Sequence, residues 1–188
     1  MKISRLTLWS INLTSHEPYY MADGKTCATV QSHILCLETD TGLKGWGEVC
    51  PIPHYLPAYA RGVPSAIEEL APEILGASPC GVDHLMRRLD AHLQGHAYAK
   101  SIVDIALWDL FGQAVGVPLY DLLGGRVQRD LPLYHSITCV APDDMARIVL
   151  ILVSQDPFQQ RRFDSILAGC KPNTRFRRII LLLQTLTY

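Results

Sequence analysis

The chain has 188 residues and a formal net charge of −1, with 48% hydrophobic and 19% charged residues. These values are typical of a soluble globular protein and exclude a disordered or collagen-like chain. The length provides material for one ordinary domain and the beginning of a second. No apolar run approaches the roughly 18 residues of a membrane helix. The first residues also lack the features of a signal peptide, so we expect a cytoplasmic location.

The first third of the sequence has the period-two pattern of β-strands. Residues from Ile3 to about Leu13 alternate, and Thr26 to Thr39 is rich in β-branched residues. A turn signal at 40–42 separates the second run from a third, so residues 34–48 predict a hairpin. We interpret two glycines of its second strand, Gly45 and Gly47, as close-packing positions. The pattern predicts a three-stranded antiparallel meander.

Three helices are predicted next. The first begins at Val63 with Pro64 in its first turn and ends at Gly76, and the second spans Asp83 to Leu93. A third helix begins near Ala99 and is interrupted at Val117-Pro118, and Gly124-Gly125 end the short helical turn that follows. Because this helix is apolar on nearly all sides, we expect it to lie between two packed layers.

A strand followed by a helix is predicted after Arg126. The strand is LPLYHSITCV, residues 131–140, and residues 141–144 open the helix with acidic groups at its positive end. This order is typical of the start of a βα series. The composition then changes near Val149, because basic residues crowd the end of the chain.

The stretch from Ala99 to Gly125, AKSIVDIALWDLFGQAVGVPLYDLLGG, resembles the signature of the mandelate racemase and muconate-lactonizing group of the enolase superfamily. The resemblance implies an α+β capping domain over residues 1–127, a meander followed by a helical bundle. It further implies that residues 128–150 are the first strand and helix of a (β/α) barrel. Residues 151–188 form a divergent basic and apolar tail, which we interpret as a frame-shifted or replaced end.

Two segments resemble the substrate-specificity loops of that family. SHEPYYMADGKT, residues 15–26, lies between the first two strands, and CPIPHYLPAYARG, residues 50–62, follows the third. In the family such loops close over the barrel mouth and exclude water. The implied substrate contacts are Tyr19, Tyr20, Met21, His54, Tyr55 and Tyr59. The alternative is that the tyrosines only cap the edge of the sheet.

The chemistry implied by the resemblance is proton abstraction beside a carboxylate, with an enediolate stabilised on Mg²⁺. Racemases, epimerases and dehydratases share it, and GEVCP with YLPAYARG resembles the branch acting on proline derivatives, such as hydroxyproline dehydratases and betaine epimerases. The lysine or histidine bases and three carboxylate ligands come from later barrel strands. We expect no catalytic residue, metal site or cofactor in this chain, because it contains no Lys-x-Lys motif. Only Asp156 and Asp164 are acidic after Asp144.

Other polar residues favour structural roles. Asp104 and Asp109 lie roughly 140° apart on a helix, so we expect buried acceptors, satisfied by backbone or Arg126, and no shared metal. The six cysteines show no C-x-x-C pair, which argues against zinc. We interpret them as small buried thiols: Cys27, Cys36, Cys50, Cys80, Cys139 and Cys170.

Three functions remain open. The chain is an inactive fragment, or one half of an enzyme whose barrel is a second polypeptide, or a non-catalytic binding module. The expected partners are a small carboxylate substrate, if a barrel completes the site, and either a second copy of the chain or a complementing barrel chain. The basic residues from Arg161 to Arg178 allow nucleic-acid binding, but we favour a solvated face because no stacking platform recurs. No membrane partner is expected.

Overall fold

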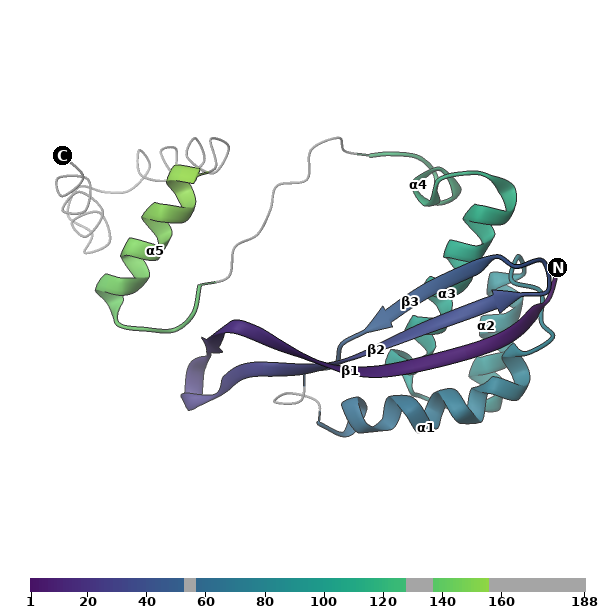
Figure 1. The fold of residues 1–188 in the computed structure, drawn as a ribbon, viewed down its shortest axis with the longest axis horizontal. Helices are drawn as coiled ribbons and strands as arrows, with labels where there is room; N and C mark the ends of the chain where they lie inside the picture. Colours follow the sequence, from purple (N-terminus) through teal and green to yellow (C-terminus); the bar gives the residue numbers. More distant parts are fainter. Residues whose placement is uncertain (53–56, 128–136, 156–188) are drawn as a thin grey trace. The chain divides into compact units, whose positions relative to one another are not determined.

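The computed structural model describes residues 1–52, 57–127 and 137–155, which fall into two compact units. The first unit comprises residues 1–17 and 27–127, and the second comprises residues 18–26 together with the chain from 128 onward. Figure 1 shows the elements in chain order. In the described ranges, no helix is long and apolar enough to cross a membrane.

The sheet has three strands in the order β1-β2-β3, with β1 at Ile3–Tyr20, β2 at Thr26–Thr39 and β3 at Lys44–Val49. The predicted antiparallel meander is confirmed. In the β2–β3 pair the register runs from His33 opposite Val49 to Glu38 opposite Lys44. At the turn between them the backbone N–H of Leu43 donates to the Thr39 hydroxyl over 3.0 Å.

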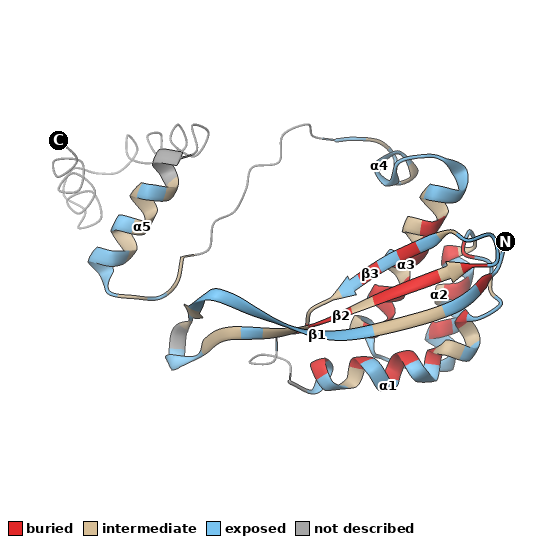
Figure 2. Cartoon of the chain, in the orientation of Figure 1, coloured by how far each residue is buried: buried red, intermediate tan, exposed pale blue. Residues whose placement is uncertain are grey.

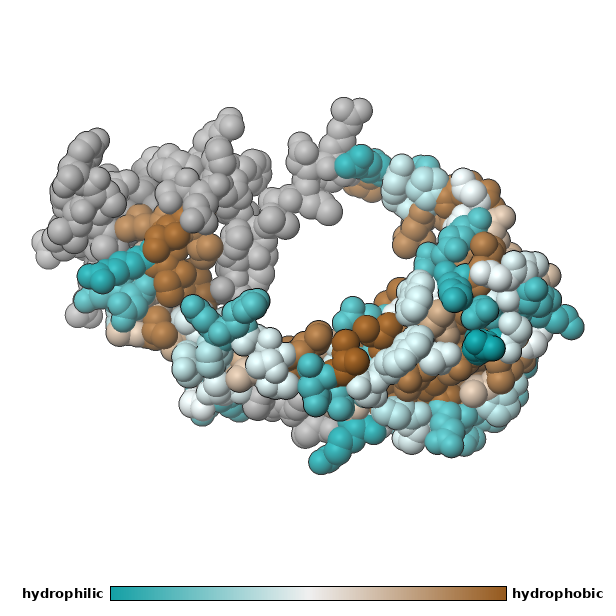
Figure 3. All heavy atoms as spheres, in the orientation of Figure 1, coloured by the Kyte–Doolittle hydropathy of each residue, from teal (hydrophilic) through white to brown (hydrophobic). Residues whose placement is uncertain are grey.

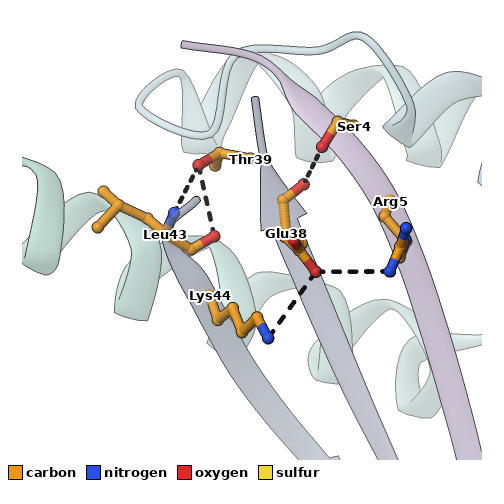
Figure 4. A network of polar contacts seen from close by, with 6 residues as sticks. All are labelled: Ser4, Arg5, Glu38, Thr39, Leu43 and Lys44. Atoms are coloured by element: carbon orange, nitrogen blue, oxygen red, sulfur yellow. Dashed lines mark hydrogen bonds and ion pairs between the residues drawn. The ribbon is translucent and has the colours of Figure 1, made fainter. Parts of the chain in front are cut away.

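One face of the sheet is polar at this end (Figure 4). The Glu38 carboxylate lies 4.0 Å from both the Arg5 and the Lys44 cation. The Ser4 hydroxyl donates to the Glu38 carbonyl over 3.1 Å. Exposed ion pairs of this kind contribute little to stability. Farther along the same face, the rings of Trp9 and Trp46 stack with centroids 5.8 Å apart.

The other face of the sheet packs against helices, and Figure 2 shows buried residues, in red, along β2 and in the helices. Leu35 and Leu37 of β2 are fully buried. Helix α3, at Ala97–Val115, lies against two glycines of β3. A Cβ atom at Gly45 would overlap the backbone carbonyl oxygen of Ala106, and one at Gly47 would overlap that of Ile102. The two glycines therefore allow α3 to lie directly on β3, as their strand positions predicted.

Helix α1 spans Pro57–Ile74, so the prediction that it begins at Val63 is wrong. Pro64 lies inside the helix, where it has no N–H for the carbonyl four residues earlier, which belongs to Ala60. His33 of β2 replaces that donor, because its Nε2 lies 2.9 Å from the Ala60 carbonyl oxygen. The fully buried His33 also has its Nδ1 2.7 Å from the Ser10 hydroxyl. The helix thus tolerates an internal proline because a side chain of the sheet takes over one hydrogen bond.

Helix α2 spans Val82–His92, within a residue of its predicted bounds at each end, and α3 spans Ala97–Val115. The buried Lys100 ammonium of α3 pairs with the Asp90 carboxylate of α2 over 2.7 Å. Apolar side chains of the sheet and three helices form one core: Ile3, Leu35, Leu37, Val63, Ile67, Leu70, Ile74, Leu85, Leu89, Ile102, Val103, Leu107 and Leu110.

The expectation that α3 lies between two packed layers is not met in the described residues. One side packs on β3, α1 and α2, but Ile105 and Val115 remain exposed. Gly116 ends the helix in the left-handed region, with φ 68°, and the short helix α4 follows at Leu119–Leu122. Gly124 and Gly125 also have positive φ, a conformation typical of residues that end a helix, as predicted for this short helical turn.

The second unit contains the tip of the β1–β2 hairpin and helix α5, at Pro142–Gln155. Asp143 and Asp144 lie in the first turn of α5, where the predicted acidic residues favour the helix dipole. The predicted strand at 131–140 lies largely outside the described residues, and its described part, 137–140, is not a strand. The predicted tail begins at residue 151, but residues 151–155 belong to α5, and its remaining part, 156–188, lies outside the described residues.

Candidate functional site

The segment predicted as the first specificity loop, residues 15–26, is mostly strand, so the prediction of a loop there is wrong. Its expected contact with substrate stays a prediction. β1 continues through Tyr20 and β2 begins at Thr26, so the connection is reduced to five residues around the 3₁₀ turn η1, Ala22–Gly24. The N–H of Met21 donates to the carbonyl of Lys25 over 2.8 Å, and Asp23 adopts φ 59°. The threonines and tyrosines of this stretch suit a strand, and an edge strand accepts Pro18.

The hairpin tip, residues 18–26, is bound to residues 137–139 of the same unit. The Tyr20 N–H donates to the Thr138 hydroxyl over 2.7 Å, and the Cys139 N–H donates to the Tyr20 carbonyl over 2.8 Å. The Tyr19 hydroxyl donates to the Ile137 carbonyl over 3.3 Å. Tyr19 is half-buried, whereas the Tyr20 side chain is 45% exposed. The two predicted contact residues therefore differ. The hydroxyl of Tyr19 is bound to the backbone, whereas the ring of Tyr20 is largely exposed.

The second predicted specificity loop contributes Tyr59, which lies on α1 in the first unit. Its ring packs at a tilt against Tyr98 of α3, with centroids 4.9 Å apart. Both rings line a cavity of about 260 Å³ together with His96, which precedes α3 in the left-handed region at φ 52°. His54 and Tyr55 lie outside the described residues.

The two carboxylates of α3 act separately. Asp109 accepts the Trp46 N–H on one oxygen and the Gln113 side-chain amide on the other, each over 2.9 Å. Its expected role as an acceptor for neighbouring backbone is confirmed, although the residue is half-buried rather than buried. Asp104 differs, because burial raises its pKa, the Asp83 carboxylate adds to the rise, and a hydrogen bond from the Trp108 side chain opposes it.

Metal ligands are not gathered in the part of the chain that the structure describes. There, no group of three or more His, Cys, Asp or Glu side chains could hold an ion. The five described cysteines are also scattered: Cys36 is buried, Cys27 and Cys50 are half-buried, and Cys80 and Cys139 are exposed. Cys170 lies outside the described residues. The expectation of buried thiols is therefore wrong for Cys80 and Cys139. Burial raises the pKa of the Cys36 and Cys50 thiols, which makes both poor nucleophiles at neutral pH.

An open apolar groove runs along α3 and α4 of the first unit. Its volume is about 570 Å³, and Trp46, Ile105 and Leu119 in its lining are each nearly half exposed. Figure 3 shows hydrophobic residues reaching the surface around α4. Monomeric proteins rarely leave a large contiguous apolar patch uncovered. The groove therefore has the character of a surface that another layer covers.

Sequence reasoning did not find Thr138, Tyr98 or His96. Thr138 belongs to the period-two run at 131–140, but nothing local indicates that its hydroxyl meets residue 20. The pairing of Tyr59 with Tyr98 depends on how α1 crosses α3, which composition does not determine.

Tyr19, Tyr20 and Met21 lie in the second unit and Tyr59 in the first.

Comparison with known proteins finds matches to one protein family. The model of the mandelate racemase/muconate lactonizing enzyme N-terminal domain matches residues 4–124. The cis-3-hydroxy-L-proline dehydratase of Roseibium aggregatum is 44% identical over 149 residues, which are 78% of this chain and 41% of that protein. The N-succinyl-L-Arg/Lys racemase of Bacillus cereus is 29% identical over 147 residues, 78% of this chain and 40% of that protein.

Solved structures agree with these relatives. A mandelate racemase/muconate lactonizing enzyme relative from Roseovarius nubinhibens, complexed with magnesium, superposes with a TM-score of 0.77 at 38% identity. The match covers 82% of this chain and 42% of that one. The chain thus spans about two fifths of the length of the relatives it matches.

Proposed function

Because the chain belongs to the mandelate racemase/muconate lactonizing enzyme family, we propose that residues 1–127 are the cap of an enzyme acting on a small carboxylate. A hydroxyproline is the first substrate class to test. The observation that carries this choice is the 44% identity over 149 residues with cis-3-hydroxy-L-proline dehydratase. Magnesium in a structural neighbour at 38% identity supports a metal-dependent reaction in the complete enzyme.

In this proposal the described residues bind and shield the substrate. The hairpin tip with Tyr19, Tyr20 and Met21, and Tyr59 at the start of α1, supply aromatic and apolar contacts. Such contacts exclude water from a reacting carboxylate and select its substituents. Abstraction of the proton beside the carboxylate needs a base that the barrel provides.

The described residues do not fit Mg²⁺. No group of three ligating side chains occurs among them, and both oxygens of Asp109 already accept hydrogen bonds. We therefore assign no step through the metal to residues of this cap.

The groove on α3 and α4 supports a barrel as the partner of the cap. The exposed side chains of Trp46, Ile105 and Leu119 present an apolar surface along α3. A barrel lid needs a surface of this kind, whereas a free-standing binding module would leave it in water. The complementing barrel chain is thus favoured over a binding module by a specific feature of the fold.

The test is complementation. The barrel of the Roseibium dehydratase, expressed without its own cap, is mixed with this chain, and dehydration of cis-3-hydroxy-L-proline is measured with and without Mg²⁺. We expect metal-dependent turnover that appears only on mixing. Ile105→Asp in the groove should abolish it, whereas Leu75→Asp, at a comparably exposed apolar residue after α1, should not.

The positive control is the same barrel with the cap of the Roseibium enzyme. If that cap restores turnover and this chain does not, the proposed capping function is wrong. Exchange of the α-proton in D₂O by this chain alone, dependent on Mg²⁺, would also contradict the proposal, because it would require a metal site within the chain.

A further inference from the structure

Both the N–H and the carbonyl of Tyr20 are hydrogen-bonded to one short segment. Its N–H donates to the Thr138 hydroxyl over 2.7 Å, and its carbonyl accepts the Cys139 N–H over 2.8 Å. The same hydroxyl lies 3.4 Å from the Tyr20 carbonyl oxygen. The contacts between Tyr20 and Thr138 join residues 118 positions apart in the sequence.

This arrangement resembles the pairing of a segment with an edge strand, except that a side-chain hydroxyl replaces one backbone carbonyl as the acceptor. β1 is an edge strand of the sheet, so one row of its backbone groups is open to another chain segment. Residues 137–139 take that place at Tyr20, and the Thr138 side chain supplies the acceptor that a neighbouring strand's carbonyl would otherwise provide. The contact therefore depends on a hydroxyl at position 138, and an apolar side chain could not make it.

Holding one backbone position fixes two side chains of the tip. Successive residues of a strand point to opposite faces, so the backbone bonds of Tyr20 orient Tyr19 and Tyr20 together. The Tyr19 hydroxyl adds a third bond, to the Ile137 carbonyl, over 3.3 Å. Only the Tyr20 ring then remains largely open to a ligand, since 45% of its surface is exposed.

We propose that Thr138 is a positioning residue that clamps the hairpin tip through the backbone of Tyr20, leaving the Tyr20 ring as the tip's substrate-selecting group. The role of the Tyr20 ring in substrate selection rests on the proposed function. The clamp, meaning the hydrogen bonds between Tyr20 and residues 138–139, is a property of the free chain.

The clamp is tested by amide hydrogen exchange in the full 188-residue chain, read residue by residue by NMR. Thr138→Val keeps the size of the side chain and removes the acceptor, so exchange at the Tyr20 amide should accelerate about fivefold, the equivalent of one net hydrogen bond. Thr138→Ser, which keeps the hydroxyl, should restore the slow exchange. Thr14→Val is the matched control, because it removes the weaker hydroxyl pair with Thr29, at 3.5 Å, away from the tip.

Unchanged exchange at Tyr20 in Thr138→Val, with core amides of α3 still protected, overturns the clamp. Equal acceleration in Thr138→Ser and Thr138→Val overturns the role of the hydroxyl. Neither result depends on dehydration of cis-3-hydroxy-L-proline. A failed complementation with a normal exchange pattern would contradict the proposed function and leave the clamp intact.

Discussion

The hydrogen bond from His33 to the Ala60 carbonyl predicts a coupling between two residues that are distant in sequence. His33→Leu leaves that buried carbonyl without a donor, because Pro64 has no N–H to offer. An unsatisfied buried acceptor costs about 1–3 kcal/mol, so we expect the variant to lose about 2 kcal/mol of unfolding free energy. The exposed Ser10 hydroxyl, the other partner of His33, can turn to water and should add little.

Pro64→Ala supplies the missing N–H within α1. In that background His33→Leu should be less destabilising by about 1 kcal/mol, the net value of one hydrogen bond. Urea unfolding of the four chains of this double-mutant cycle, followed by circular dichroism, measures the coupling. His33→Gln provides a control, because its amide can still donate to the carbonyl. Equal losses from His33→Leu in the parent chain and in the Pro64→Ala variant would refute the idea that histidine replaces the proline's missing donor.

Three further predictions concern residues of β3 and α3. Gly47→Ala should destabilise the fold by about 1–3 kcal/mol in urea unfolding, since its Cβ would overlap the Ile102 carbonyl. The control is Gly62→Ala on α1, which has open space around it and should be neutral or stabilising. Similar effects at both sites would contradict this packing. Asp109→Ala should cost about 1–2 kcal/mol in thermal unfolding because the Trp46 N–H loses its acceptor, and a loss near zero would mean that water replaces it. Asp104 has a raised pKa in the fold, so the folded state binds its proton more tightly and stability falls as pH rises through that range. Asp104→Asn should therefore gain stability relative to the parent at about pH 7 but not at about pH 3, and a gain independent of pH would be inconsistent with a desolvated carboxylate.

The elements that the sequence predicted well are those with strong local signals. β2 was predicted at its observed bounds, because a period-two run ends at turn residues 40–42. The bounds of α2 were predicted to within one residue, and Gly124 and Gly125, which end the turn of α4, lie where predicted. In each case neighbouring residues contain the whole signal, either as periodicity or as backbone conformations that favour glycine.

The errors occur where distant residues decide the outcome. A proline close to a candidate start normally marks a first turn, but α1 begins earlier because His33 from the sheet satisfies the carbonyl that Pro64 leaves open. Pro18 and Gly24 suggested a loop at 15–26, yet both strands continue to the turn at Ala22–Gly24. The partner of Tyr20 is Thr138, and no pattern near either residue encodes that pairing. The sequence also failed to predict that one face of α3 is exposed, because periodicity identifies apolar residues but not the elements that cover them.

The contact between Tyr20 and Thr138 also bears on the order in which the chain folds. The core helices and the sheet are complete once residue 115 has been synthesised, whereas the partner of Tyr20 follows only at residue 138. Closing so long a segment is entropically costly and slow compared with local contacts. We therefore expect the hairpin to form first with its tip unsecured, and the tip to be fastened as one of the last events of folding. A substitution at Thr138 should then speed unfolding of the tip without changing how fast the core assembles.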